Sequence, residues 1–135
     1  MSSSSDKRNV FISYSRQDTE AARELVSELE KAGVSVWLDI AEIRPGDRWQ
    51  SMIQEELRKA RVMVVLLTPS SLASQWTYFE VGAAVADGKI IIPVLSKDVL
   101  PEQVPSLLRN FQWISDSPVD KAAKLIADAV SSASE

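Results

Sequence analysis

The sequence predicts an α/β fold with a flavodoxin-like, five-stranded parallel sheet in the order 2-1-3-4-5 and helices on both faces. Segments with strand and helix patterns alternate strictly along the 135 residues, and the connections between them are short. Residues 62–67 are apolar throughout, which is typical of a strand buried on both faces of a sheet. In this strand order, a ligand crevice opens beyond the carboxyl ends of the first and third strands.

The strands come from segments that are short, apolar and rich in β-branched residues. They are expected at residues 10–14, 34–38, 62–67, 90–95 and 111–114. Pro93 lacks an N–H, which is a mild objection to a central place for the fourth strand. The fifth strand is short and is expected at an edge of the sheet.

Helix patterns follow the strands, with apolar residues recurring every three or four positions. The first helix begins after Asp18, a candidate N-cap, and ends at Gly33. The second begins at Asp47, which forms a capping-box pattern with Gln50. The remaining helices are expected at residues 74–88, 101–108 and 118–130.

Composition limits the domain organisation and the chemistry. We expect one domain at residues 9–131, between a disordered tail at 1–8 and a frayed end at 132–135. The chain has no cysteine and no histidine, which excludes thiolate chemistry and histidine-based triads and removes the usual zinc ligand. The net charge of −4 argues against nucleic acid or an anionic membrane as a direct partner. No apolar run has the length of a membrane span, and a cytoplasmic location is expected.

Glu80 is the most informative residue. It lies in the helix expected at 74–88, which is apolar on nearly every side and is therefore expected to be buried. A lone carboxylate on the stripe of Trp76, Phe79 and Ala83 is costly unless it is paired or used. Glu80 is therefore either a member of a structural ion pair or a functional residue. The crevice of the predicted fold lies near this helix, which favours a functional residue.

Motifs of other nucleotide-binding and signalling folds are absent from the sequence. It contains neither a Gly-rich dinucleotide fingerprint nor a phosphate-binding P-loop. A response-regulator receiver has the same topology, but it needs an acidic cluster after the first strand and an Asp at the end of the third. Here those strands end in Ser-Tyr-Ser and Leu-Leu-Thr, so the receiver is excluded.

Four motifs resemble the TIR (Toll/interleukin-1 receptor) domain of the bacterial, NAD-cleaving type. They are FISYSRQD at 11–18, VWLDIAEIRPGDRW at 36–49, SQWTYFE at 74–80 and FQWI at 111–114. Each motif is weak alone, but four of them in order on the expected elements are specific. The resemblance covers residues 8–129, and it implies the same flavodoxin-like fold that the alternation of elements predicts.

The resemblance implies an NAD glycohydrolase. Enzymatic members of the family cleave NAD between nicotinamide and ribose, and they carry a Glu four residues after a Trp in the helix that follows the third strand. Glu80 and Trp76 match that spacing, and Ser74 matches a serine that is common two residues before the Trp. We therefore expect Glu80 to be catalytic, NAD to be the substrate, and no metal or further cofactor. The products would be nicotinamide and ADP-ribose or a cyclic isomer.

The resemblance also implies substrate contacts for further residues, but each of them matches the family less specifically than Glu80 and Trp76. The resemblance puts Tyr14, Ser15 and Arg16 on the nicotinamide and phosphate side of the crevice, although a solvated loop charge is an equal alternative for Arg16. Asp39 opens the long loop after the second strand, where a capping role is slightly favoured. Trp49 either stacks on a ring of NAD or packs in the core.

The resemblance also implies partners. Family members often act only when assembled, so the expected partners are other TIR domains, in a homo-oligomer or filament, in defence or cell-death signalling. Arg44, Pro45 and Gly46 form the loop tip that relatives use for such contacts, with an ordinary surface turn as the alternative. Two rivals remain: a non-catalytic adaptor, which often lacks the Glu, and a TIR domain that binds a nucleotide without cleaving it.

Overall fold

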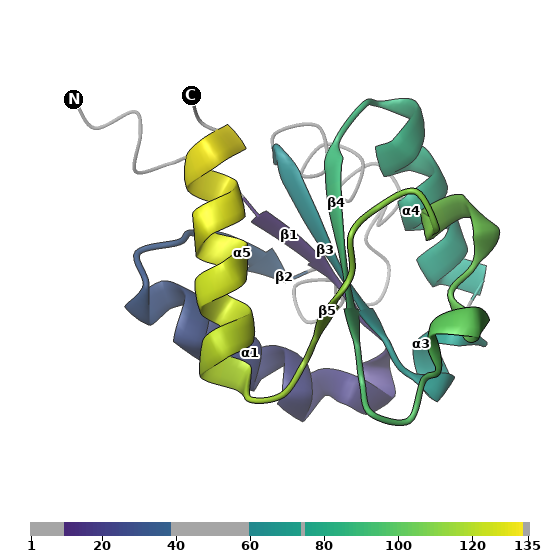
Figure 1. Cartoon of the computed structure of the whole chain (residues 1–135), viewed down its shortest axis with the longest axis horizontal. Coiled ribbons are helices and arrows are strands. Elements are labelled where there is room, and N and C mark those ends of the chain that lie inside the picture. The colour runs from purple at the N-terminus through teal and green to yellow at the C-terminus, as the bar shows by residue number, and fades with distance from the viewer. Residues whose placement is uncertain (1–9, 39–59, 74, 134–135) are drawn as a thin grey trace, which may run out of the picture.

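A computed structural model describes residues 10–38, 60–73 and 75–133, without the side chains of 37–38, 75–77, 79–80 and 133. These residues form a parallel sheet with helices on both faces (Figure 1). The strands are β1 (Val10–Ser13), β2 (Val36–Leu38), β3 (Val62–Leu67), β4 (Ile90–Leu95) and β5 (Ile114–Ser115). The helices are α1 (Thr19–Lys31), α3 (Pro69–Leu72), α4 (Gln75–Ala86) and α5 (Val119–Ala133). The helix expected after Asp47 lies outside the described residues.

The sheet formed by these strands has the order β2-β1-β3-β4-β5. Each neighbouring pair of strands is parallel, so the prediction of a parallel α/β sheet is confirmed. β1 and β3 pair in the centre, from Val10 opposite Val62 to Ser13 opposite Val65. The carboxyl ends of these two strands therefore lie at the same edge of the sheet.

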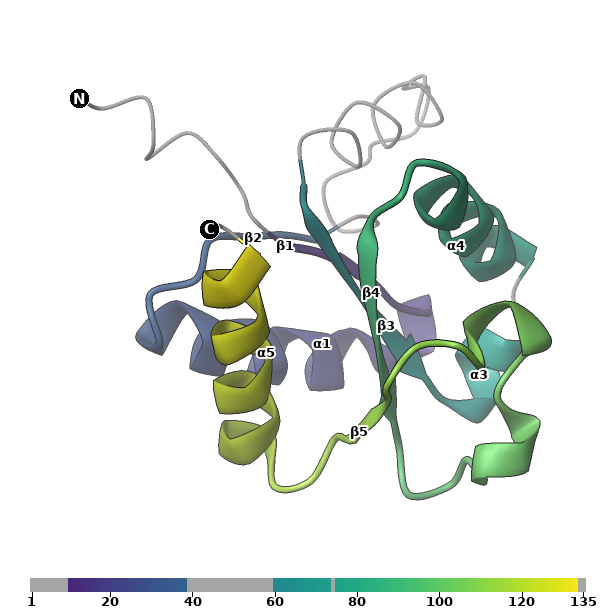
Figure 2. The same cartoon turned by 45° about the horizontal axis from the view of Figure 1, so that its top comes forward.

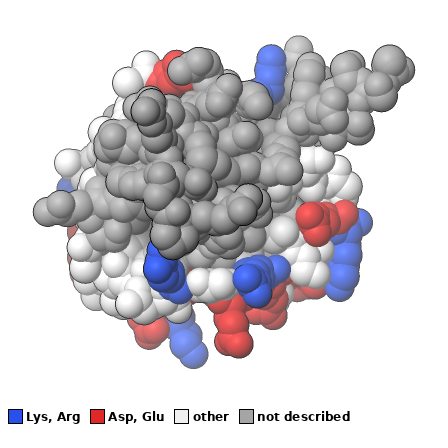
Figure 3. All heavy atoms as spheres, turned by 180° about the vertical axis from the view of Figure 1, so that it is seen from behind, with Lys and Arg blue, Asp and Glu red and all other residues white. Residues whose placement is uncertain are grey.

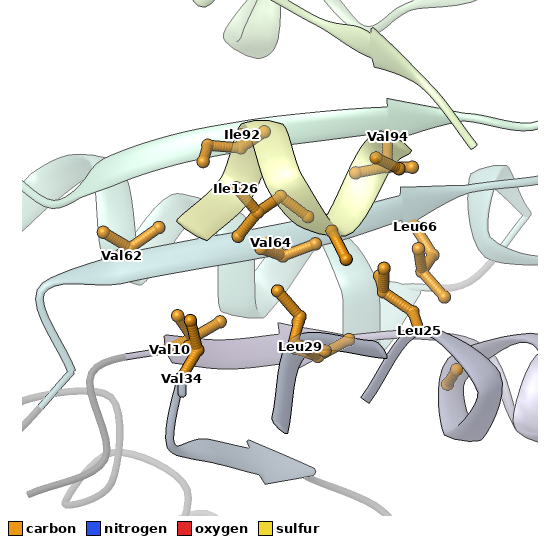
Figure 4. Close-up of a cluster of buried hydrophobic side chains, with 14 of the residues drawn as sticks. Val10, Leu25, Leu29, Val34, Val62, Val64, Leu66, Ile92, Val94 and Ile126 are labelled. Carbon is orange, nitrogen blue, oxygen red and sulfur yellow. The ribbon is translucent and has the colours of Figure 1, made fainter. Parts of the chain in front are cut away.

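Successive side chains of the central strands point to opposite faces of the sheet and so contribute to two separate cores. One set of strand side chains, which includes Val10, Ile12, Val62, Val64 and Ile92, packs against Leu25 and Leu29 of α1 and Ile126 of α5 (Figure 4). The intervening strand side chains, which include Phe11, Met63, Val65 and Ile91, form a second core with Val81 and Ala84 of α4 and with Leu108. Figure 2 shows α1 and α5 on one face of the sheet and α4 on the other. Every residue of β1 and β3 is buried, as expected for strands covered on both faces.

α4 is buried on one side and not all round, which corrects the expectation from its composition. Val81 and Ala84 are 2% and 1% exposed, whereas Tyr78 is 43% exposed. The Tyr78 hydroxyl donates a hydrogen bond to the Leu72 carbonyl at 3.0 Å. A tyrosine can thus bury part of its ring while its polar end stays at the surface.

The segment between β4 and β5 also differs from the prediction. In place of a helix at 101–108, it forms two 3-10 turns, Pro101–Gln103 and Ser106–Leu108. Pro105 separates them, because proline has no N–H for a helical hydrogen bond and its ring obstructs the preceding turn. The strand expected at 111–114 is the shorter and later β5, since the Phe111 N–H donates back to the Leu108 carbonyl at 3.0 Å.

Pro93 lies in β4, which has a neighbour on each side. β5 pairs only with Val94 and Leu95 of β4. The proline therefore precedes the β4–β5 ladder, where a missing N–H is tolerated. At the other end of the chain, α5 continues to Ala133, two residues beyond the predicted domain boundary.

Leu29→Ala is expected to lower the free energy of unfolding by about 2–5 kcal/mol, because it leaves a cavity between α1 and the sheet. Leu29 is 0% exposed, whereas Leu125 on α5 is 45% exposed. Leu125→Ala is the matched control and should change the free energy by less than about 0.5 kcal/mol. Urea unfolding measures both variants, and equal losses would contradict this packing.

Asp116, just after β5, makes the stability depend on pH. Its N–H donates to the Leu95 carbonyl at 3.0 Å. Partial burial raises the pKa of its carboxyl above the usual 3.8, although a hydrogen bond with Ser117 and the charge of Lys97 oppose this. The folded state therefore favours the protonated carboxyl. The stability that this group contributes is fully present below the unfolded pKa and is lost as pH rises through the folded pKa.

Asp116→Asn removes this titration. At neutral pH the variant is expected to be more stable than the parent, because the parent there contains a partly desolvated carboxylate. Below about pH 3 the difference should shrink, since the carboxyl is then protonated in both states. Urea unfolding at several pH values tests this, and a gain that grows toward acid pH would contradict it.

Candidate functional site

Two chain junctions meet at the carboxyl edge of β1 and β3. After β1 the chain passes through Tyr14 and Ser15 into a 3-10 turn, Arg16–Asp18, and then into α1. After β3 it passes through Thr68 into α3, which leads toward α4. This is the edge at which parallel α/β folds bind ligands.

One side-chain hydrogen bond joins the two junctions. Thr68 Oγ1 donates to Asp18 Oδ2 at 2.5 Å, between residues 50 positions apart in the sequence. Asp18 occupies the N-cap position of α1, but its side chain forms no capping hydrogen bond there. The predicted N-cap position of Asp18 is therefore confirmed, but its carboxylate accepts from the hydroxyl at the end of β3 and not from the N–H groups of α1. Sequence reasoning missed this pair.

Thr68 also begins α3. Its Oγ1 accepts a hydrogen bond from the Ser71 N–H at 3.1 Å, and Ser71 Oγ accepts one from the Thr68 N–H at 2.9 Å. This reciprocal arrangement is a capping box, which satisfies donors that the first turn of a helix leaves unpaired. Ser71 is 0% exposed, so the hydrogen bonds that fix the turn after β3 include a side chain that is shielded from solvent.

The predicted residues at the end of β1 have different environments. Tyr14 is 1% exposed and packs in the core that faces α1 and α5. Ser15 is 8% exposed, and its hydroxyl donates to Gln17 Oε1 at 2.9 Å. Arg16 is exposed. Of these three, only Arg16 presents its side chain to solvent, and a direct contact between substrate and Tyr14 has no support from this burial.

Trp76 and Glu80 both lie in α4, four residues apart, so the two positions are on the same side of the helix. Their side chains are outside the described residues. Asp39, Trp49 and Ser74 also lie outside the described residues, as do the loop-tip residues Arg44, Pro45 and Gly46. Their expected roles remain predictions.

A cavity of about 200 Å³ lies at the same edge of the sheet and is lined by residues of α1, of α5 and of the carboxyl ends of β3 and β4. Its polar lining comes from Glu24, Thr68, Ser96, Asp116 and Ser117, and its apolar lining includes Leu25, Leu66 and Val94. Of these residues, only Thr68 belongs to the junction described above. The predicted substrate residues whose side chains are described do not line this cavity.

The described surface carries charges of both signs. On the face shown in Figure 3, Lys and Arg side chains lie beside Asp and Glu side chains around the rim. Within the described ranges, no three acidic side chains are arranged to hold a metal ion, and no helix is long and apolar enough to cross a membrane. The expectations of no metal and no nucleic-acid partner stay predictions.

Comparison with known proteins identifies the family. Residues 10–126 match the sequence model of a family described as TIR domain. NAD(+) hydrolase TcpC of Escherichia coli is 34% identical over 90 residues, 62% of this chain and 29% of that protein. The 2' cyclic ADP-D-ribose synthase BtTIR of Bacteroides thetaiotaomicron is 31% identical over 105 residues, 72% of this chain and 37% of that protein.

A solved structure agrees with this match. A metazoan TIR-STING receptor from C. gigas superimposes with a TM-score of 0.78 at 25% identity, over 92% of this chain and 39% of that one. The chain spans less than half the length of each of these three proteins. Since the family match extends from β1 into α5 and the fold agrees, the chain belongs to the TIR domain family.

Proposed function

We propose that this TIR domain is an NAD glycohydrolase that cleaves the bond between nicotinamide and ribose. The observation that carries the proposal is the pair Trp76 and Glu80, four residues apart in the helix that leaves the β3 edge. Matched relatives named NAD(+) hydrolase and 2' cyclic ADP-D-ribose synthase support it. Products would be nicotinamide and either ADP-ribose or a cyclic isomer.

We assign the sheet to the flavodoxin-like order 2-1-3-4-5, with β5 as a two-residue edge strand. In this order the ligand crevice opens beyond the ends of the first and third strands. Arg16, which is exposed after β1, is suited to the diphosphate of NAD, because guanidinium binds phosphate oxygens in pairs. From the carboxyl end of β3 the chain passes through α3 to the start of α4, so α4 follows the same edge of the sheet.

The chemistry requires only one carboxylate. When the bond between the ribose C1′ and the nicotinamide nitrogen breaks, its electron pair goes to the ring, and nicotinamide leaves as a neutral molecule without a general acid. The ribose then has oxocarbenium character, which the Glu80 carboxylate would stabilise. Water adds to C1′ and loses a proton to give ADP-ribose, or a hydroxyl of the same molecule adds to give a cyclic isomer.

The remaining candidates would bind the substrate around that centre. We assign Trp76 and Trp49 to ring contacts, and Asp39, Ser15 and Ser74 to polar contacts. Tyr14 would act indirectly, by packing beneath the crevice, because its side chain is 1% exposed.

Glu80→Gln is expected to lower nicotinamide release at least about 100-fold, because it removes the charge that would stabilise the developing oxocarbenium while keeping the side-chain size. The matched control is Glu30→Gln on α1, where Glu30 is exposed, and it should keep the parent rate. Release is measured by chromatography with the domain concentrated or bound to a surface.

The outcomes separate the alternatives. Equal release by parent and Glu80→Gln would keep the enzyme and exclude Glu80 as its centre. No release by the parent, with assembly confirmed by light scattering, would favour an adaptor, or a nucleotide-binding module if NAD still binds.

We also propose that assembly with other copies of the domain activates it, through the loop tip at Arg44, Pro45 and Gly46. The rate per domain is then expected to rise with domain concentration, because a neighbouring copy completes the site. Arg44→Glu should weaken this rise and leave the free energy of unfolding unchanged. A rate per domain that stays constant while scattering shows assembly would contradict activation by assembly.

A further inference from the structure

We infer that Asp18 and Thr68 are positioning residues that tie the start of α4, the helix that carries Glu80, to the chain junction after β1 by way of α3. The inference rests on the proposed function for the role of Glu80, whereas the hydrogen bonds that carry it are independent of that function.

The Thr68 hydroxyl takes part in two hydrogen bonds, one to Asp18 and one to Ser71. It donates to Asp18 Oδ2 at 2.5 Å and accepts from the Ser71 N–H at 3.1 Å. A hydroxyl has a single proton to donate, and here it is used across the two junctions. One side chain therefore fixes the first turn of α3 and attaches that turn to the start of α1.

A second contact continues from α3 to α4. The Leu72 carbonyl, at the end of α3, accepts a hydrogen bond from the Tyr78 hydroxyl at 3.0 Å. Tyr78 is two residues before Glu80 in α4. The connected groups thus run from Asp18 through Thr68, the four-residue α3 and Tyr78 to the first half of α4.

α3 depends on these bonds, because a helix of four residues is not stable alone. The second half of α4 is held differently, by the apolar contacts of Val81 and Ala84 with the core. Loss of the Asp18–Thr68 bond is therefore expected to loosen α3 and the start of α4 while leaving the end of α4 packed.

The environment of Asp18 supports a positioning role over a purely local one. Asp18 is half-buried, and its carboxylate makes no capping bond to its own helix. Hydrogen bonds to a carboxylate are short and roughly twice as strong as those between neutral groups. A misplacement of a reacting group by about 1 Å can cost about 100-fold in rate, so a small shift of α4 would reach the chemistry.

The test compares disruptive and conservative variants. Asp18→Ala removes the link and keeps the Thr68–Ser71 capping box, whereas Thr68→Val removes the link and also the capping bond that Thr68 Oγ1 accepts from the Ser71 N–H. Asp18→Asn keeps an acceptor oxygen, and Thr68→Ser keeps the hydroxyl. The disruptive variants are expected to lower kcat about tenfold or more, and the conservative ones less than about threefold, with KM nearly unchanged in all four.

Amide hydrogen exchange supplies a readout that does not depend on activity. Asp18→Ala should exchange faster than the parent in residues 69–80, with α5 unchanged, and Asp18→Asn should resemble the parent. Faster exchange throughout, α5 included, would indicate a general loss of stability and overturn the inference. An Asp18→Asn variant as impaired as Asp18→Ala would also overturn it.

The two proposals fail in distinguishable ways. If the assembled parent releases no nicotinamide, the proposed function fails, while faster exchange at residues 69–80 in Asp18→Ala would still support the positioning of α4. If the parent is active and Asp18→Ala matches it in kcat and in exchange, the positioning inference fails and the proposed function stands.

Discussion

The parallel pairing of β1 with β3 is the constraint on which the rest of the structure depends. Ser13, the last residue of β1, lies opposite Val65, and β3 continues for two more residues. At about 3.3 Å per residue, this extension carries Thr68 past the end of β1. The chain after β1 turns at this point into α1, so Asp18 and the end of β3 come within hydrogen-bonding distance. A different register would separate them.

Burial on both faces of the sheet explains why the polar groups gather at this edge. β1 and β3 are buried along their whole length, and their side chains alternate between the two cores. An unpaired polar group inside either core would be costly. The carboxyl edge is where the strands end and where Ser15, Asp18 and Thr68 satisfy one another or the turns that follow.

Local patterns predicted much of the fold, and contacts distant in sequence account for much of what they missed. The apolar run of β3 and the alternation of elements predicted the parallel sheet. Tyr14 packs in the same core as Val10 and Ile12, as period-two alternation along the first strand would place it. Nothing local to Asp18 could reveal its partner, which lies 50 residues away. The helix bearing Trp76 and Glu80 was predicted, whereas the geometry of the candidate site depends on side chains outside the described residues.

α4 is held in two different ways, and the difference bears on the proposed chemistry. Its second half packs through Val81 and Ala84, and such apolar contacts are non-directional. Its first half is tied to α3 by the hydrogen bond of Tyr78, which has a defined geometry. A carboxylate that stabilises a developing charge acts through its fixed position relative to that charge. A directional contact near Glu80 would therefore serve the proposed mechanism by fixing the start of α4, while the apolar contacts of Val81 and Ala84 hold the rest of the helix.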